Sequence, residues 1–411
     1  MSQPRPLPTF ARSLTHAALA LLCATALGIA ACGGGGGGGS SSSSSGVTTE
    51  QPASSTGKTT VFGAALNEPW GLAFLPEGRM LVSEKGGVLR VLSADGNAVL
   101  ASLDGPPGVT AGNQGGLLDV ALDPADSRSV YMTFSELGDG VAGTALARGQ
   151  LNANYDGWQQ SPQVIWQQQP KVQGGVHYGS RIAFRDDGTL YVAVGERGVE
   201  NTTGTPRSDA LGVQNAANTI GKVVRLNRDG SPADGSALGI WSTGHRNPQG
   251  AAVRPGTNEL WITEHGPQGG DELNLVTAGG NHGWPVKSYG CPYDDSKPKD
   301  EACRIGGGTH TGYTEPISYW VPTSTAPSGL MFYTGDQFPN WKGSLFSGAL
   351  ASATLWRLAV DGNNNVTREE VAAVKALGVR IRDVRQGPDG NIYLLTNGSG
   401  ANGNRVVRLA P

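Results

Sequence analysis

The sequence predicts an all-β fold, a six-bladed β-propeller with four-stranded blades around a central channel, and three observations lead to it. The chain of 411 residues contains 63 glycines and only 16% charged residues, a composition typical of many turns and few long helices. Only residues 368–377 resemble a helix, and valines interrupt them. One unit recurs six times: a glycine-containing turn, a short apolar strand, a Pro/Asp/Gly turn, and a second strand rich in Val, Leu and Tyr.

The six copies of this unit are spread unevenly over the chain. Their first strands are expected at residues 69–74, 116–121, 179–184, 248–253, 327–332 and 381–384. Their second strands are expected at residues 80–84, 130–132, 190–194, 260–262, 344–346 and 391–395. A β-sandwich is the main alternative, but it would not restart one pattern six times. Short strands at 59–62 and 405–409 would close the ring by sharing one blade.

The N-terminal residues 1–31 are expected to be a lipoprotein-type signal peptide. Arg5 and Arg12 precede an apolar run that is as long as a signal-peptide core and short for a membrane span. The run ends at Cys32, which we expect to carry the lipid. An ordinary secretory signal, cleaved after a small residue, is the alternative.

Residues 32–57 are expected to form a flexible linker, and the propeller domain to span 58–411. The segment 33–46 consists of glycine and serine alone, which favours a coil that tethers the domain to a bilayer. By analogy with other lipoproteins, Gly33 after the cysteine favours the periplasmic side of the outer membrane; the free periplasm is the alternative location.

The net charge and the cysteines of the chain each support one expectation, the first about partners and the second about a disulfide. The formal net charge is −3, and a nucleic-acid-binding protein would need a basic face, so we expect no nucleic-acid partner. Cys291 and Cys303 lie in a loop rich in Pro, Asp and Lys. In an oxidising periplasm we expect them to form a disulfide with a structural role.

Polar side chains occur at equivalent places in the repeats, at or just before a first strand. They are Gln114, His177, Arg246, Asn247, Arg380 and Arg382. Equivalent positions in successive blades converge on one end of the channel, so we expect these groups to meet. Each alone has an ordinary explanation as a surface or turn residue, and only their co-occurrence supports a site. Arg380 and Arg382 would point the same way in a strand, where two guanidinium groups suit an anion.

Seven segments resemble the soluble PQQ-dependent aldose sugar dehydrogenases of the glucose/sorbosone dehydrogenase family. They are residues 114–119, 177–182, 244–250, 265–272, 280–285, 326–329 and 380–383. The resemblance runs in order from about residue 60 to the end of the chain. It implies an enzyme with a six-bladed propeller that binds pyrroloquinoline quinone (PQQ) and Ca²⁺ in a central cleft. It also implies oxidation of the anomeric carbon of an aldose to the lactone, with electrons passed to a periplasmic or membrane acceptor.

The resemblance also assigns roles to individual residues. His177 would be the general base that takes the proton of the anomeric hydroxyl, and Glu196 would orient it. Arg246 would stabilise the anion that develops on the quinone oxygens. The remaining cofactor-binding residues would be Gln114, Asn247, His265, Asp271, Arg380 and Arg382. For calcium, the backbone carbonyls of Gly266 and Pro267 would bind the cofactor ion, which would polarise the quinone, and Glu272 would bind a second, structural ion.

Three positions depart from the family pattern. Val176 stands where some members carry an aspartate, and His265 replaces a glutamine of the best-known enzyme. Around residues 348–352 no lysine occurs, although members often place one there to pair with a quinone carboxylate. The missing lysine puts cofactor affinity in question more than chemistry.

Two other functions stay open. A calcium-dependent hydrolase of the lactonase type would also be a propeller, but it would use carboxylates and asparagines around its metal rather than arginines. A non-catalytic surface lipoprotein that binds a ligand would need no intact cofactor site. Because propellers host many functions, the fold alone does not choose among the three.

Overall fold

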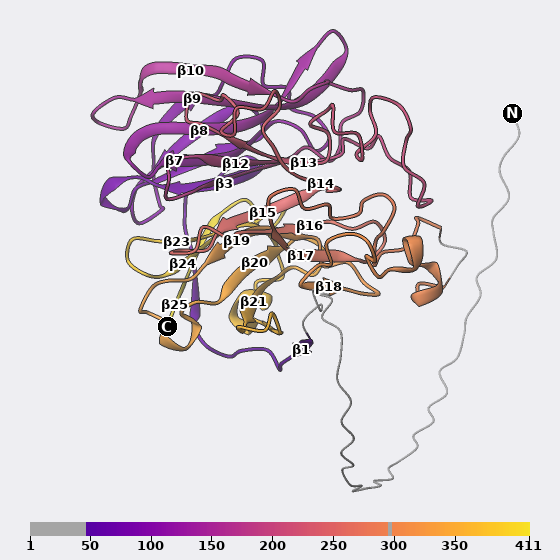
Figure 1. Cartoon of the computed structure of the whole chain (residues 1–411). Helices are drawn as coiled ribbons and strands as arrows, with labels where there is room; N and C mark the ends of the chain where they lie inside the picture. The colour runs from indigo at the N-terminus through magenta and orange to yellow at the C-terminus, as the bar shows by residue number, and fades with distance from the viewer. Residues whose placement is uncertain (1–46, 295–297) are drawn as a thin grey trace, which may run out of the picture. The chain divides into compact units, whose positions relative to one another are not determined.

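The computed structural model describes residues 47–294 and 298–411, and the predicted signal peptide, Cys32 and the glycine–serine tract lie outside them. Six sheets, each containing four strands connected as an antiparallel meander, make up the described part of the chain (Figure 1). The predicted all-β, six-bladed propeller is therefore confirmed.

Each of the first five blades uses four strands in chain order. Blade one contains β3 (Pro69–Phe74), β4 (Met80–Glu84), β5 (Val88–Leu92) and β6 (Val99–Asp104); blade two contains β7 (Leu117–Asp123), β8 (Asp126–Gly138), β9 (Val141–Leu151) and β10 (Trp158–Gln167). Blade three contains β11 (Gly179–Phe184), β12 (Leu190–Val194), β13 (Lys222–Leu226) and β14 (Ile240–Thr243); blade four contains β15 (Pro248–Val253), β16 (Leu260–Glu264), β17 (Asp271–Val276) and β18 (Ser318–Trp320). Blade five contains β19 (Pro327–Phe332), β20 (Leu345–Ala349), β21 (Thr354–Val360) and β22 (Val366–Glu370).

Blade six joins the two ends of the domain. It contains β23 (Arg380–Gln386), β24 (Ile392–Asn397) and β25 (Val406–Ala410), and its fourth strand is the N-terminal β2 (Lys58–Val61). β2 pairs antiparallel with β25, with Thr59 opposite Leu409. The predicted closure is confirmed, and it leaves no break in the ring of blades.

Residues before β2 also pair with a blade. β1 (Thr48–Glu50) adds to the outer edge of blade five, parallel to β22. Arg368 of β22 forms an ion pair with Glu50, and the backbone N–H of Gln51 donates to the Arg368 carbonyl at 2.9 Å. Part of the segment assigned to the linker thus covers an otherwise open sheet edge.

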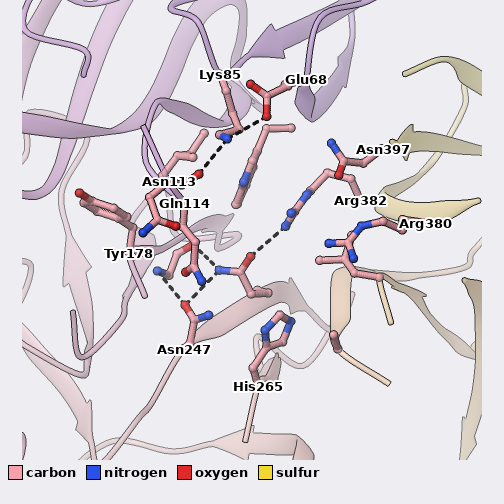
Figure 2. Close-up of a pocket in the computed structure, with 16 residues that line it drawn as sticks. Glu68, Lys85, Asn113, Gln114, Tyr178, Asn247, His265, Arg380, Arg382 and Asn397 are labelled. Carbon is pink, nitrogen blue, oxygen red and sulfur yellow. Dashed lines mark hydrogen bonds and ion pairs between the residues drawn. The ribbon is translucent and has the colours of Figure 1, made fainter. Parts of the chain in front are cut away.

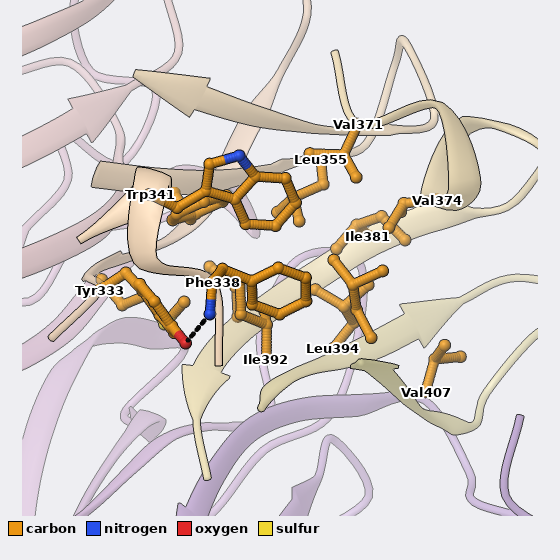
Figure 3. Packing of buried hydrophobic residues seen from close by; sticks show 14 of the residues in the cluster. Tyr333, Phe338, Trp341, Leu355, Val371, Val374, Ile381, Ile392, Leu394 and Val407 are labelled. Carbon is orange, nitrogen blue, oxygen red and sulfur yellow. Dashed lines mark hydrogen bonds between the residues drawn. The ribbon is translucent and has the colours of Figure 1, made fainter. Parts of the chain in front are cut away.

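The first strand of every blade faces the channel. Neighbouring first strands contact one another in a closed cycle, β3–β7–β11–β15–β19–β23–β3. Apolar side chains fill the space between adjacent blades. Between blades five and six, for example, Phe338, Trp341 and Leu355 pack with Ile381 and Leu394 (Figure 3).

Helical structure in the described residues is limited to single turns. The α-helix α1 (Ala372–Lys375) lies inside the predicted helical stretch. Four 3₁₀ turns are η1 (Pro76–Gly78), η2 (Glu301–Cys303), η3 (Ile305–Gly307) and η4 (Pro339–Trp341). Within the described ranges, no helix has the length and apolar character to cross a membrane.

Candidate active site

A β-bulge near the start of each first strand shapes the channel end where these strands begin. In all six blades the pairing between the first and second strands shifts register there. In β3, β15 and β23 the residues skipped by the pairing are Trp70, Gln249 and Arg382. A bulge re-aims the side chain of its extra residue, and all three residues line one cavity.

This cavity has a volume of about 370 Å³ and receives residues from all six blades (Figure 2). Five of the predicted cofactor-binding residues line it: Gln114, Asn247, His265, Arg380 and Arg382. Its other lining residues are Glu68, Trp70, Lys85, Asn113, Leu118, Tyr178, Gly179, Gln249, Ala326, Leu350 and Asn397. Of the six equivalent positions singled out in the sequence, Gln114, Asn247, Arg380 and Arg382 therefore meet in this cavity, whereas His177 and Arg246 do not line it.

His177 lies beside this cavity, directly before β11. It has a φ of 51°, and its backbone N–H donates to Gln114 Oε1 at 2.8 Å. Its Nδ1 contacts Oε1 of the buried Glu196. Since a carboxylate can only accept, Nδ1 carries the proton, and Nε2 is left with a lone pair. The structure thus brings together the predicted base and the carboxylate predicted to orient it.

The pKa shifts of His177 and Glu196 favour the protonation states in which His177 can act as a base. Burial lowers the pKa of His177, and the positive charge of Arg246 acts in the same direction, while the hydrogen bond with Glu196 opposes them. Burial acts to raise the pKa of Glu196, but the hydrogen bond with His177 and its charge outweigh burial, so that this pKa is lowered. At neutral pH the imidazole is therefore neutral and the carboxylate ionised, the state in which Nε2 accepts a proton.

Arg246 is buried next to the loop that follows β16. Its guanidinium donates to the carbonyl oxygen of Gly266 at 2.6 Å, to that of His265 at 3.3 Å, and to the hydroxyl of Tyr293 at 3.1 Å. It also lies 5.2 Å from the ring centre of Trp284. These contacts hold one fixed positive charge at the loop 265–270.

The neighbouring His245 has both ring nitrogens in contact with other protein side chains. It is fully buried, with Nδ1 3.0 Å from Glu264 Oε1 and Nε2 2.8 Å from Ser242 Oγ. The other oxygen of Glu264 accepts from the backbone N–H of Arg246 at 2.8 Å. His245 and Glu264 therefore fix the strand start that presents Arg246 and Asn247.

Amide side chains and Arg382 form a network in the cavity wall. Gln249 donates to Asn247 Oδ1 at 3.2 Å and accepts from Arg382 at 3.0 Å. Arg382 also donates to Ser328 Oγ at 3.2 Å, yet its buried Nε has no protein partner among the described residues. Burial and the nearby charges of Arg181 and Arg380 lower the pKa of Arg382 to about 9. An anionic ligand would satisfy the free donor and offset the repulsion.

The residues expected at calcium lie in and beside the loop 265–270. The backbone N–H of Gly266 donates to Asp271 Oδ1 at 3.0 Å, and Asp271 Oδ2 accepts from the Ala326 N–H at 2.7 Å. Asp271 thus ties this loop to blade five and does not line the cavity.

Glu272 faces a buried polar cluster rather than the cavity. Its Oε2 accepts from Asn274 at 3.1 Å, and Oε1 lies 3.5 Å from His310 Nε2. Burial raises the pKa of Glu272 well above its usual value, and the negative charge of Glu264 adds to this rise. Nevertheless, within residues 47–294 and 298–411 no group of three or more His, Cys, Asp or Glu side chains could hold a metal ion.

Cys291 and Cys303 form a disulfide, with their Cα atoms 5.2 Å apart. The bond closes the loop that carries Tyr293, the aromatic partner of Arg246. The expected pairing therefore also helps to hold a residue next to Arg246.

An ionic cluster in the channel was missed by the sequence analysis. The fully buried Arg181 lies 3.1 Å from Asp119 Oδ1 and 3.0 Å from Asp383 Oδ1, and its guanidinium stacks on Trp70 at 4.1 Å. Arg385 reaches both carboxylates as well. The available signal for this cluster was a charged residue inside an otherwise apolar first strand, Asp119 in the second copy and Arg181 in the third, whereas Asp383 lies in a strand with several other charges.

Comparisons with known proteins identify the family of this chain. The family model "Glucose / Sorbosone dehydrogenase" matches residues 66–408. Aldose sugar dehydrogenase YliI of Escherichia coli (strain K12) is 39% identical over 371 residues, covering 87% of this chain and 94% of that protein. The crystal structure of the soluble aldose sugar dehydrogenase from Escherichia coli in the apo-form has a TM-score of 0.76 and 37% identity, covering 87% of this chain and all of that one.

A third similar structure contains a cofactor. The PQQ-bound form of aldose sugar dehydrogenase from Streptomyces coelicolor has a TM-score of 0.65 and 27% identity, covering 87% of this chain and 99% of that one. The chain therefore belongs to the glucose/sorbosone dehydrogenase family, a family of oxidoreductases.

Proposed function

We propose that this protein is a PQQ-dependent aldose sugar dehydrogenase that oxidises the anomeric carbon of an aldose to the lactone. The observation that carries the proposal is the neutral His177, held by a buried carboxylate beside a cavity lined by arginines. When bound, PQQ supplies a hydride acceptor. The family membership and the PQQ-bound relative support this choice of cofactor.

The protein's own part in the reaction begins with proton transfer. Glu196 holds the Nδ1–H of His177, so that Nε2 takes the proton of the anomeric hydroxyl as hydride leaves the same carbon. The imidazolium that results is stabilised by the Glu196 carboxylate. Arg246 supplies a fixed positive charge, which stabilises negative charge that develops on the acceptor.

The cavity suits an anionic, planar cofactor. PQQ is a tricarboxylate, and Arg380 and Arg382 offer guanidinium groups on one wall, one of them with an unpaired buried donor. Gln114 and Asn247 add amide groups that can bind carbonyl or carboxylate oxygens. The residues that line the cavity are therefore suited to bind PQQ.

We also propose that calcium binds beside the cofactor. Gly266 and Pro267 offer carbonyl oxygens and Glu272 a carboxylate, all of them ligands that calcium accepts. The Gly266 oxygen also accepts from Arg246. Bound there, the ion would polarise the quinone.

The N-terminal sequence supports the proposed location, and the family resemblance supports the proposed electron acceptor. We propose that lipid on Cys32 anchors the domain at the periplasmic side of the outer membrane, and that a periplasmic or membrane protein takes the electrons. Globomycin, which blocks lipoprotein signal processing, tests this: the wild-type precursor should accumulate, whereas Cys32→Ser should yield no lipidated form. Release of unmodified wild-type protein into the soluble periplasm would contradict it.

The enzyme assignment is tested by titrating apo-protein with PQQ, with and without Ca²⁺, and measuring dye-linked oxidation of an aldose panel. Saturable, PQQ-dependent oxidation is expected. Tight PQQ binding without turnover of any aldose would favour the ligand-binding lipoprotein. Lactone hydrolysis that needs calcium but no PQQ would favour the lactonase-type hydrolase.

A further inference from the structure

A lysine that the proposed mechanism does not use lies in the same cavity. Lys85 follows β4 in blade one, and its side chain is 15% exposed. It lines the cavity together with Arg380 and Arg382 of blade six (Figure 2). The cavity is thus lined by cations from two blades.

The main chain holds Lys85 in place from both sides. Its backbone N–H donates to the Glu68 carbonyl at 3.1 Å, and its carbonyl accepts from the Leu117 N–H at 3.0 Å. A Cβ atom on Gly116 would lie only 2.3 Å from the Lys85 oxygen, and Gly116 has a φ of 143°. Because blades one and two approach so closely here, the lysine side chain starts from a fixed point at the cavity wall.

The ammonium group is only partly engaged by the protein. Nζ donates to Glu68 Oε1 at 3.0 Å and to the Asn113 carbonyl at 3.1 Å. An ammonium has three donors, so within the described part of the chain two of them have protein acceptors. The Glu68 side chain is 57% exposed, and ion pairs with such exposed partners are weak and screened by salt. A ligand carboxylate can therefore compete for Lys85.

The charges of the lining residues point to a polyanion. Lys85, Arg380 and Arg382 are cationic, and Glu68 is the one carboxylate among the residues that line the cavity. Glu68 also has a φ of 45°, a left-handed conformation unusual for a residue other than glycine. An anionic residue is thus held next to Lys85 at a cavity that otherwise favours anions.

We propose that Lys85 binds a carboxylate of the cofactor and that Glu68 competes with the cofactor for this ammonium group. The inference rests on the proposed function. In the free protein Glu68 holds Lys85, and on binding the ligand carboxylate takes its place or shares the ammonium with it. Lys85 thereby adds a blade-one contact to those of Arg380 and Arg382.

The two partners should then have opposite effects on affinity. PQQ binding to apo-protein is measured by quenching of tryptophan fluorescence, to which Trp70 in the cavity contributes. Lys85→Gln should raise the Kd for PQQ about tenfold or more, because a charge-assisted contact is lost. Lys85→Arg should stay within about threefold of wild type. Glu68→Gln should bind PQQ more tightly than wild type, since the competing carboxylate is gone, and an unchanged Kd would overturn the competition by Glu68.

A matched control and a salt series complete the test. Lys342 forms an exposed ion pair with Asp336 at 2.7 Å, away from the cavity, so Lys342→Gln should leave the Kd unchanged. Added KCl should weaken PQQ binding less in Lys85→Gln than in wild type.

The possible failures are distinguishable. If wild-type protein binds no PQQ, the proposed function and this inference fall together. If wild type binds PQQ and Lys85→Gln binds it equally well, only the inference is overturned. Equal weakening by Lys85→Gln and Glu68→Gln, with the same loss of thermal stability, would make the pair a structural bridge and would also overturn it.

Discussion

The Nδ1 atom of His177 is in hydrogen-bonding contact with Oε1 of Glu196, a buried residue nineteen positions later in the chain. The contact joins the loop before β11 to the loop after β12, two segments brought together by the antiparallel pairing of these strands. The backbone therefore places a base and its carboxylate partner at the channel end where six blades meet. We expect catalysis to depend on this pair.

The first prediction concerns the charge on Glu196. Glu196→Gln keeps an oxygen that can accept from Nδ1–H but removes the charge that stabilises the imidazolium. We expect kcat to fall by about 10²-fold, with little change in the Kd for PQQ, in steady-state assays of the loaded enzyme. Glu259→Gln, which breaks an exposed ion pair with Arg254, should keep the wild-type kcat. A Glu196→Gln enzyme with wild-type kcat would contradict the proposal that the Glu196 charge stabilises the imidazolium.

The second prediction concerns pH. Burial lowers the pKa of His177 below 6.5, and only the neutral imidazole accepts a proton. Activity should therefore be lost as the pH falls through this lowered pKa, so the acid limb of kcat/KM should have its midpoint below 6.5. Since the hydrogen bond and charge of Glu196 raise the pKa of His177, Glu196→Gln should move the midpoint to still lower pH. A shift to higher pH would contradict the assignment.

The third prediction concerns the buried ionic cluster. Arg181 is fully buried between Asp119 and Asp383. Among the described residues, Arg181→Met leaves these carboxylates with Arg385 as their only cationic partner, and we expect the free energy of unfolding to fall by about 3–5 kcal/mol. Urea denaturation measures it. Arg254→Met removes a partly exposed guanidinium and should cost under about 1 kcal/mol by the loss of its ion pair. Equal effects of the two substitutions would contradict the importance of the cluster.

Much of the fold could be predicted because each blade starts with the same local pattern. The six predicted first strands match β3, β7, β11, β15, β19 and β23 to within a few residues. The outer strands carry weaker patterns, and β1 was assigned to a linker because so short a segment becomes a strand only by pairing with the edge of blade five.

The candidate site was predicted in part, and its gaps have identifiable causes. The rule that selected Gln114 and His177, a polar residue just before a first strand, also applies to Glu68 in the first copy but was not extended to it. Lys85 follows the second strand of its blade, as Glu196 and His265 do in theirs. The family resemblance, however, places the lysine that pairs with a quinone carboxylate near residues 348–352. The bulge that directs Arg382 into the cavity depends on strand pairing, so no local pattern could indicate it.

The central claim is that His177 is the base, and it is tested most directly by one rapid-mixing experiment. PQQ-loaded wild type and PQQ-loaded His177→Ala are mixed with excess aldose, and cofactor reduction is followed by its absorbance in a single turnover. We predict that His177→Ala binds PQQ with near-normal affinity but reduces it at least about 10²-fold more slowly than wild type. Equal rates of reduction in the two loaded proteins would contradict the assignment of His177 as the base.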